Sequence, residues 1–261
     1  MSFDKTCNRR EALAGIGTVS LGALLAACGS DDEASSTSAS VSTEAGETAL
    51  VEPRSGKDLA SLFDETSSCT LTAEGTEGPY YFDVDKIRTD IREDREGTPL
   101  RLVMRVRDSE SCEALANAVV DIWHCDAGGI YSGFEEQSIE AGGTPEASAN
   151  TGPGTFLRGA QVTNRDGIVE MTTIYPGWYQ GRTVHIHAKV HLDNSTVLTT
   201  QFYFDDAVSS GVYAEGDPYR LDDDRQVFND SDGTFDASLV LTLSEEDGGF
   251  LGTISFDVAQ A

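Results

Sequence analysis

One short segment gathers side chains that could hold a metal ion. Tyr179, Arg182, His185 and His187 lie within nine residues. The two histidines alternate, so on a β-strand both imidazoles would leave the same face of the sheet. Two neutral imidazoles supply two ligands, and phenolic oxygens nearby favour a hard, oxidised ion such as Fe(III) over Zn(II). The alternative is a polar pair on a solvated strand face.

A second segment strengthens the metal interpretation. Residues 121–131 are predicted to be a strand running into a glycine-rich turn, with Trp123 eight residues before Tyr131. Together the two segments resemble the intradiol ring-cleavage dioxygenases, the family of the catechol, hydroxyquinol and protocatechuate dioxygenases. The matches to the family's pattern extend from about residue 69 to 205. Tyr179 follows Pro-Gly-x, Arg182 lies three residues before H-x-H, and Gln201 lies fourteen residues after the second histidine. Upstream, Gly78-Pro79-Tyr80 matches the family's Gly-Pro-Tyr segment.

The resemblance implies a ligand set and a reaction. Tyr131, Tyr179, His185 and His187 would bind one Fe(III) per chain. A small aromatic diol of the catechol type would chelate the iron and displace Tyr179, which would accept one substrate proton. Reaction with O2 would cleave the ring between the two hydroxyls and give a cis,cis-muconate-type diacid.

The resemblance also implies roles around the metal. Arg182 would stabilise negative charge that develops on the ring, and Gln201 would hydrogen-bond in the same region. The substrate pocket would include Gly78, Pro79 and Tyr80. The link from Tyr179 to Arg182 is very short, whereas protocatechuate dioxygenases carry a longer loop there. The natural substrate, and a catabolic or a protective role, therefore stay open.

Two interpretations from other classes compete with the dioxygenase. The first is a zinc hydrolase or zinc-binding lipoprotein that uses His124, His185 and His187. The second is a non-catalytic β-sandwich binding module, and metal analysis separates all three. If the chain is a dioxygenase, His124 and His191 are expected to make structural or surface contacts. Cys125 is then expected to be a small buried residue.

The elements that position these residues are predicted to be mostly strands. Short apolar runs separated by turns favour an all-β fold, a β-sandwich with a short N-terminal helix over residues 57–65. No ten-residue stretch after residue 66 combines a helical period with caps. The acidic stretches 222–224 and 229–233 are expected to be solvated loops rather than a calcium site. The expected strands are 100–106, 118–124, 156–163, 168–174, 183–192, 197–204, 238–243 and 251–258.

The first 28 residues are expected to be a targeting segment. Arg9 and Arg10 form a twin-arginine pair, and the apolar run 13–27 is shorter than the roughly 20 residues that span a bilayer. Leu25-Ala26-Ala27-Cys28 looks like a bacterial lipobox, so Cys28 is the expected lipid anchor, on the outer face of a bacterial cytoplasmic membrane. The alternative is an ordinary cleaved secretory signal. Twin-arginine export carries folded proteins, which suits an enzyme that acquires its metal before export.

Composition bounds the partners of the remaining chain. Residues 29–56 are rich in Ser, Thr, Ala and Glu and are predicted to be a disordered linker to one domain over residues 57–261. The net charge of −27 disfavours nucleic acid and direct docking onto anionic lipid. The resemblance also bears on the oligomeric state. Cytoplasmic family members often carry an added N-terminal helical dimerisation region, whereas only a short helix is expected here, so a monomer is favoured.

The cysteines divide between the signal and the exported domain. Cys7 and Cys28 belong to the signal segment. Cys69 and Cys112 lie in polar, loop-like contexts and are the expected disulfide pair, because disulfides persist outside the cell.

Overall fold

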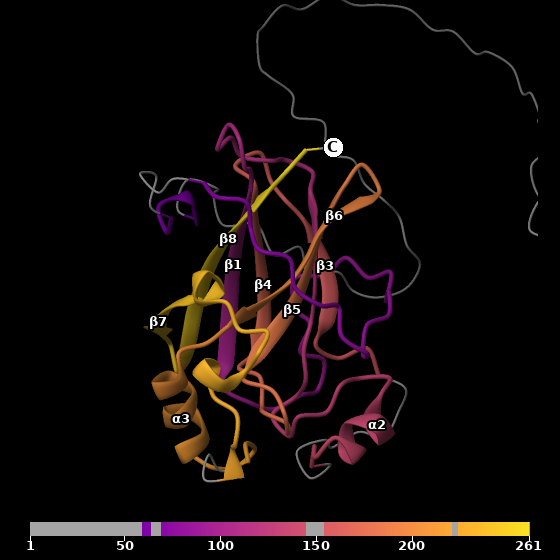
Figure 1. Ribbon diagram of the computed structural model, residues 1–261, viewed down its shortest axis with the longest axis vertical. Coiled ribbons are helices and arrows are strands. Elements are labelled where there is room, and N and C mark those ends of the chain that lie inside the picture. The colour runs from indigo at the N-terminus through magenta and orange to yellow at the C-terminus, as the bar shows by residue number, and fades with distance from the viewer. Residues whose placement is uncertain (1–58, 64–68, 145–153, 221–223, 261) are drawn as a thin grey trace, which may run out of the picture. The chain divides into compact units, whose positions relative to one another are not determined.

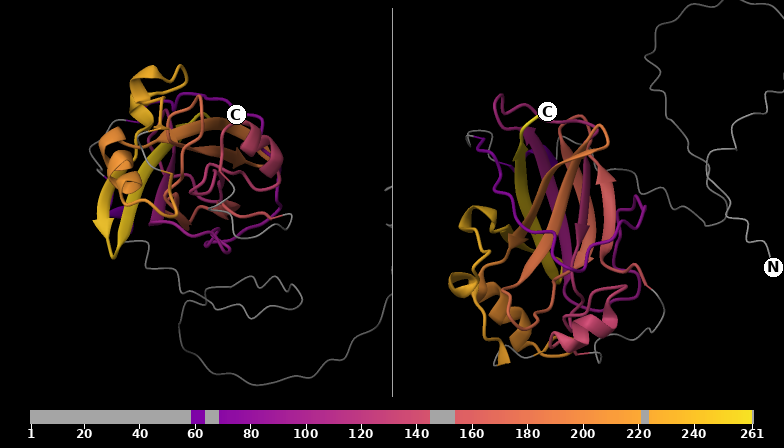
Figure 2. Two further views of the ribbon diagram at one scale, coloured as in Figure 1. Left: turned by 90° about the horizontal axis from the view of Figure 1, so that it is seen from below. Right: turned by 45° about the vertical axis from the view of Figure 1, so that its right-hand side comes forward.

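Two four-stranded sheets stack face to face around a shared apolar core (Figures 1 and 2). The computed structural model describes residues 59–63, 69–144, 154–220 and 224–260, which all belong to one compact unit, Val51–Ala261. The β-sandwich expected from the sequence is confirmed. The signal segment and the linker lie outside the described residues, as do residues 57–58 and 64–65 of the expected N-terminal helix. Residues 59–63 of that helix form one helical turn, in which Leu62 N donates to the Leu59 carbonyl and Phe63 N to the Ala60 carbonyl, both at 3.1 Å.

The two sheets have the strand orders β4-β1-β8-β7 and β3-β2-β5-β6, and every neighbouring pair is antiparallel except β1 and β8. We call them the charged sheet and the histidine sheet, after the side chains on their outer faces. The strands of the charged sheet are β1 (Pro99–Asp108), β4 (Ile168–Ile174), β7 (Thr242–Glu246) and β8 (Gly249–Val258). The strands of the histidine sheet are β2 (Val119–Trp123), β3 (Arg158–Val162), β5 (His185–Leu192) and β6 (Ser195–Tyr203).

Alternation along the strands separates the core from the outer faces. On β5, Ile186, Ala188 and Val190 join the main apolar cluster. Because successive side chains on a strand point to opposite faces, His185 and His187 leave the outer face of the histidine sheet. The strand pattern therefore presents both imidazoles together, as expected from the sequence.

Two short helices were not predicted. They are α2 (Glu135–Glu140) and α3 (Asp206–Ala214), and both lie at the same end of the sandwich (Figure 1). Asp205 begins α3, because its carboxylate accepts hydrogen bonds from the backbone N–H groups of Ala207 and Val208. Both helices are shorter than the ten-residue pattern sought in the sequence, which is why they did not stand out.

Strand β7 differs most from its predicted position. The sequence predicted a strand over residues 238–243, but Ala237–Leu239 forms the 3-10 helix η4, whose first turn is capped by Asp236. Strand β3 also begins two residues late, because Leu157 has a φ of 57°, which lies outside the strand region. Local turn chemistry moved both boundaries.

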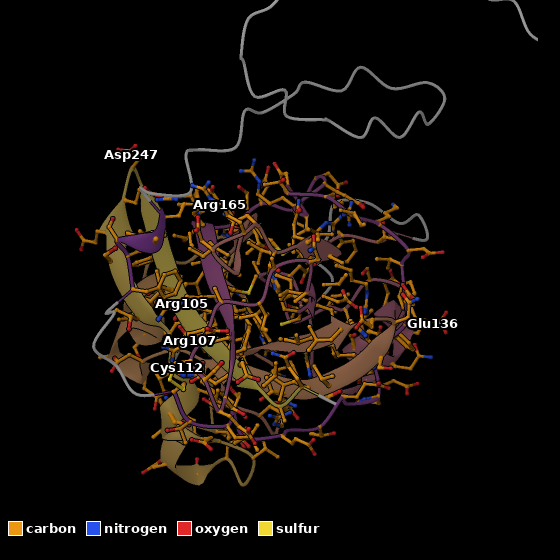
Figure 3. All side chains as sticks on the ribbon, turned by 90° about the horizontal axis from the view of Figure 1, so that it is seen from above. Arg105, Arg107, Cys112, Glu136, Arg165 and Asp247 are labelled. Atoms are coloured by element: carbon orange, nitrogen blue, oxygen red, sulfur yellow. A yellow bond between two sulfur atoms is a disulfide. The ribbon has the colours of Figure 1, made fainter. Side chains whose placement is uncertain are left out.

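The outer face of the charged sheet carries a network of ion pairs. Arg101 contacts Glu170 and Glu246 at 3.0 and 2.6 Å. Arg107 Nε and Asp257 Oδ1 are 2.8 Å apart, and both side chains are buried. Figure 3 shows Arg107 beside Arg105 on β1, well away from Glu136 of α2.

One disulfide closes the chain around β1. Cys69 and Cys112 are joined, with their Cα atoms 5.4 Å apart. This is the pairing expected from the sequence. None of the helices in the described part of the chain is long and apolar enough to cross a membrane.

Candidate metal centre

His185 and His187 bring their outer ring nitrogens together. His185 Nδ1 lies 2.7 Å from the carbonyl oxygen of Thr183. Since a carbonyl only accepts, Nδ1 carries the proton and Nε2 of the neutral ring presents a lone pair. His185 Nε2 lies 3.1 Å from His187 Nε2. The strand therefore aims two ring nitrogens at one point.

Trp123 holds the ring of His187 in place. The two residues are partners across β2 and β5, and their rings stack with centroids 4.9 Å apart and planes 8° apart. Tyr81 packs on Trp123 at 4.6 Å, and its hydroxyl donates to the buried Asp121 at 3.1 Å. Burial raises the pKa of Asp121 to about 6.

Two interlocked turns deliver Tyr131 and Tyr179. Gly177 N donates to the carbonyl of Asp126 at 3.0 Å, and a Cβ on Gly177 would come within 2.3 Å of the Ala127 carbonyl oxygen. Gly129, with φ of +85°, leaves no room for a Cβ beside the Trp178 carbonyl. The backbone of the turn before Tyr131 therefore packs directly on the backbone of the turn before Tyr179. This contact fixes the positions of the two tyrosines relative to each other.

Both tyrosine hydroxyls reach the histidine pair. Tyr179 Oη lies 3.2 Å and Tyr131 Oη 3.5 Å from His185 Nε2. Tyr131 is fully buried, and its backbone N–H donates to Ser138 of α2 at 3.0 Å. Tyr179 is only half-buried. Of the two tyrosines, Tyr179 is thus the one that keeps some exposure to solvent.

This arrangement fits a metal better than it fits a hydrogen-bond network. His185 Nε2 has one lone pair but three polar neighbours, namely Tyr131 Oη, Tyr179 Oη and His187 Nε2. Atoms that bind one ion at about 2.1 Å, with angles of roughly 90–110°, lie about 3.0–3.4 Å apart. The three separations from His185 Nε2, 3.1, 3.2 and 3.5 Å, are close to that range, so one cation would satisfy all four donors.

The electrostatics keep these donors neutral. Burial, with the charge of Arg182, lowers the pKa of His185 to about 3. Burial and the neighbouring His185 lower the pKa of His187 well below its usual value. Burial likewise raises the pKa of Tyr131 and of Tyr179. Both imidazoles therefore offer lone pairs at neutral pH, whereas the two phenols need a strongly Lewis-acidic ion to become tyrosinates.

Arg182 lies beside this centre in a network that the sequence did not predict. Its Nη2 donates to Gln201 Oε1 at 2.5 Å, and its Nε donates to Asp232 Oδ2 at 2.8 Å. Gln201 is buried opposite His187 on β6 and donates its amide N–H to the Thr76 carbonyl at 2.8 Å. Gln201 thus links Arg182 to the segment that precedes Gly78.

Asp232 corrects an interpretation of the sequence. The stretch 229–233 was expected to be a solvated loop, but Asp232 is only 9% exposed. The residues around Asp232 in the sequence did not indicate its burial, because its partner Arg182 lies 50 residues away. Of the other acidic stretch, residues 222 and 223 lie outside the described residues.

The segment Gly78-Pro79-Tyr80 adjoins the donors. A Cβ on Gly78 would lie 3.1 Å from Cε1 of His187. The Tyr80 and Tyr131 rings have centroids 4.9 Å apart. Two of the sequence-predicted pocket residues, Gly78 and Tyr80, are therefore brought beside the sequence-predicted ligands, and Pro79 between them in the chain is exposed.

The remaining polar candidates have other partners. His124 is fully buried and uses both ring nitrogens, on the Cys125 carbonyl and on Thr173 Oγ1. Cys125 is buried, and His191 Nδ1 pairs with Thr196 Oγ1 at 3.0 Å. No cluster of three or more His, Cys, Asp or Glu side chains suited to a metal occurs among the residues that the structure describes. Because both ring nitrogens of His124 already have partners, it is a poor third histidine ligand, which disfavours the three-histidine zinc interpretation.

Comparison with known proteins agrees with this geometry. A family model described as Dioxygenase matches residues 76–212. An intradiol ring-cleavage dioxygenase from Tetranychus urticae is 32% identical, with a TM-score of 0.64 over 73% of this chain and 95% of that one. The dioxygenase domain of a dioxygenase–carbohydrate-binding protein fusion from Streptomyces sp. SirexAA-E is 30% identical, with a TM-score of 0.52 over 73% and 99% of the two chains.

Sequence relatives include proteins of named specificity. A chlorocatechol 1,2-dioxygenase of Pseudomonas putida is 27% identical over 157 residues, which are 51% of this chain and 54% of that protein. The chain thus spans about half the length of this relative.

Proposed function

Because the chain belongs to the intradiol ring-cleavage dioxygenase family, we propose that it cleaves the aromatic ring of a catechol-type diol between its two hydroxyls, using O2. One diol and one O2 would give one cis,cis-muconate-type diacid, with both oxygen atoms retained in the product. The convergence of two phenol oxygens and two imidazole nitrogens on one point carries this proposal.

We propose that Tyr131, Tyr179, His185 and His187 hold one Fe(III) per chain. The family is generally dependent on non-haem iron. When bound, a ferric ion would supply Lewis acidity that eases deprotonation of the diol. Two anionic phenolate oxygens and two neutral imidazole nitrogens form a donor set with two hard oxygen ligands, which suits the ferric state.

Tyr179 is the proposed proton acceptor. It keeps some exposure while Tyr131 has none, and burial raises its pKa, so it favours the phenol form once it is free of a counter-charge. Its Oη would therefore take one proton from a substrate hydroxyl. Tyr131, fixed by Ser138 and packed on Tyr80, would stay in place.

Arg182 would stabilise negative charge that develops on the substrate ring. Its guanidinium is a permanent cation close enough to Tyr179 and His185 to affect the pKa of each. Gln201 would hold that cation through its carbonyl oxygen. Gly78, Pro79 and Tyr80 would form the adjacent pocket wall.

The substrate is proposed to be a catechol without added carboxylates. The chain carries a net charge of −27, which would repel an anionic, carboxylate-bearing substrate at long range. The chlorocatechol and catechol 1,2-dioxygenases among its relatives are named for such diols. Parallel assays with catechol, a chlorocatechol and protocatechuate test this preference, which would be wrong if protocatechuate were cleaved fastest.

Metal content and visible absorption of the purified protein test the proposed function. We expect one iron per chain, a tyrosinate-to-iron band that shifts when catechol is added without O2, and a diacid product in air. A colourless protein that contains zinc and no iron would contradict it. So would a fully iron-loaded protein that leaves every catechol intact.

We also propose that the protein is exported and attached to the membrane through a lipid on Cys28. The twin arginines, the short apolar run and the Leu-Ala-Ala-Cys sequence support this location. Cys28→Ser should release the protein from the membrane fraction of expressing cells. Mass spectrometry that finds an unmodified Cys28 in the mature protein would contradict it.

A further inference from the structure

The Asp232 carboxylate makes four hydrogen bonds at the edge of the metal centre. Oδ2 accepts from Arg182 Nε and from Thr183 N, both at 2.8 Å. Oδ1 accepts from Thr234 N at 2.8 Å and from Thr234 Oγ1 at 2.7 Å. Both oxygens are thus occupied, and the side chain is almost inaccessible.

This carboxylate stays ionised. Burial opposes its ionisation, but the hydrogen bonds from Thr234, Thr183 and Arg182 prevail and hold its pKa down to about 2. It is therefore a fixed negative charge at any pH at which the protein works.

The segment that carries Asp232 is pinned to the histidine sheet. Asn229, in the 3-10 helix η3 (Asn229–Ser231), accepts from Thr183 Oγ1 at 2.6 Å and donates to the Phe204 carbonyl at 2.8 Å. These contacts tie the segment to the approach to β5 and the end of β6. The segment lies beyond residues 76–212, which the family model matches.

Asp232 determines where the Arg182 guanidinium can lie. With Nε on Asp232, Nη2 reaches both Gln201 Oε1 at 2.5 Å and Thr234 Oγ1 at 2.6 Å. Nη1 makes no hydrogen bond to any residue that the structure describes. Three bonds therefore fix the planar group, and its remaining donors are available to a substrate.

We propose that Asp232 is a positioning residue for ring cleavage, which holds the Arg182 guanidinium in the orientation that stabilises negative charge on the substrate. This inference rests on the proposed function. Pre-orientation matters because a displacement of about 1 Å in a catalytic group can cost up to about 100-fold in rate.

Charge and orientation predict opposite effects for Asp232→Asn. The substitution removes a negative charge beside Arg182, so charge alone would strengthen stabilisation of an anion. Asparagine has only one accepting oxygen and turns an N–H donor toward Arg182 or Thr234, so orientation is lost. Positioning therefore predicts slower turnover, and a purely electrostatic role predicts equal or faster turnover.

The test compares kcat in the iron-loaded protein for wild type, Asp232→Asn, Arg182→Ala and the double variant. We expect Asp232→Asn to lower kcat by about 10-fold or more, with KM, iron content and the tyrosinate band little changed. In the Arg182→Ala background it should change kcat by less than about twofold, because its effect acts through Arg182. Asp230→Asn, at an exposed neighbour in η3, is the matched control and should behave as wild type.

Three outcomes would overturn the positioning role: unchanged or faster turnover in Asp232→Asn, an equal fall in the Arg182→Ala background, or loss of iron together with activity. A readout independent of turnover is solvent exchange of the Arg182 Nε–H proton, followed by NMR in protein loaded with diamagnetic Ga(III). We expect exchange at least about 10-fold faster in Asp232→Asn than in wild type. Absence of ring cleavage by the iron-loaded wild-type protein would instead overturn the proposed function. The contact between Asp232 and Arg182 would then have no role in catalysis.

Discussion

The outer faces of the two sheets have the same alternating strand pattern but carry different kinds of polar side chain. On the charged sheet, Arg101 and Arg107 lie against Glu246 and Asp257, so these two cations have counter-charges. On the histidine sheet, neutral donors gather around His185 Nε2, which has one lone pair for three polar neighbours. The polar groups of the first face pair with one another, whereas those of the second face would be completed by the proposed cation.

The difference distinguishes a stabilising polar cluster from a functional one. Buried ion pairs are stable only when both partners are present, because a lone buried charge is costly. Lone pairs that converge on one point from neutral side chains do not stabilise one another. Such a cluster becomes favourable when a ligand binds to all of them. Side chains on the charged face should therefore control unfolding, and those on the histidine face should control metal content and turnover.

Loss of a donor should give the largest effect. His187→Ala should lower iron affinity by well over the roughly 10–100-fold seen when only a supporting partner of a metal ligand is removed. Iron content and the visible band measure this. The control is His191→Ala, four residues along β5, which should keep both. Equal iron in the two variants would break the comparison.

Loss of one member of a buried ion pair should give the next largest effect, on stability alone. Asp257→Asn removes the buried carboxylate that Arg107 contacts at 2.8 Å and should lower the free energy of unfolding by about 3–5 kcal/mol. Urea unfolding measures this, and kcat should be unchanged at temperatures where the variant is folded. Arg165→Met, at a 78% exposed side chain, should change stability by less than about 0.5 kcal/mol.

Loss of the catalytic cation should affect turnover without affecting the metal. Arg182→Ala should lower kcat by about 100-fold, comparable to removal of an oxyanion stabiliser, while the iron content stays constant. Steady-state kinetics with iron analysis of the same samples measure this. Full activity in this variant would remove Arg182 from the proposed mechanism.

The smallest effect should come from Asp121, an acid on the histidine face. Its pKa of about 6 in the folded protein exceeds the usual value near 3.9, so the folded state holds its proton more tightly. Stability from this group is complete below about pH 4 and falls as the pH rises to about 6, by roughly 1–3 kcal/mol. Asp121→Asn should flatten that part of the stability profile, measured by urea unfolding from pH 4 to 7. An unchanged slope would show that other groups cause it.

The sequence predicted those parts of the molecule that depend on short spacing. The H-x-H alternation, Tyr179 after Pro-Gly and Tyr131 after the glycine-rich turn are local patterns, and the structure brings those residues together. Most strands were also predicted, because two-residue periodicity follows directly from burial on one face.

What the sequence did not predict depends on contacts between distant segments. Asp232 resembles any acid in a polar turn until Arg182, 50 residues earlier, is placed against it. Helix α3 depends on the single cap at Asp205 over nine residues, which is too short for a periodic signal. The first two residues of the sequence-predicted strand 238–243 belong instead to the short helix η4, for the same reason.

The parallel pairing of β1 with β8 determines the order in which the sheets can be completed during synthesis. Arg107 and Asp257 are 150 residues apart, so β1 emerges from the ribosome long before the strand that lies beside it. All four strands of the histidine sheet have been made by residue 203. The charged sheet stays open along one side of β1 until β8 arrives, and that unpaired edge is exposed to other chains in the meantime. The face that controls stability is therefore the last to close, and the growing chain is most prone to aggregation just before it does.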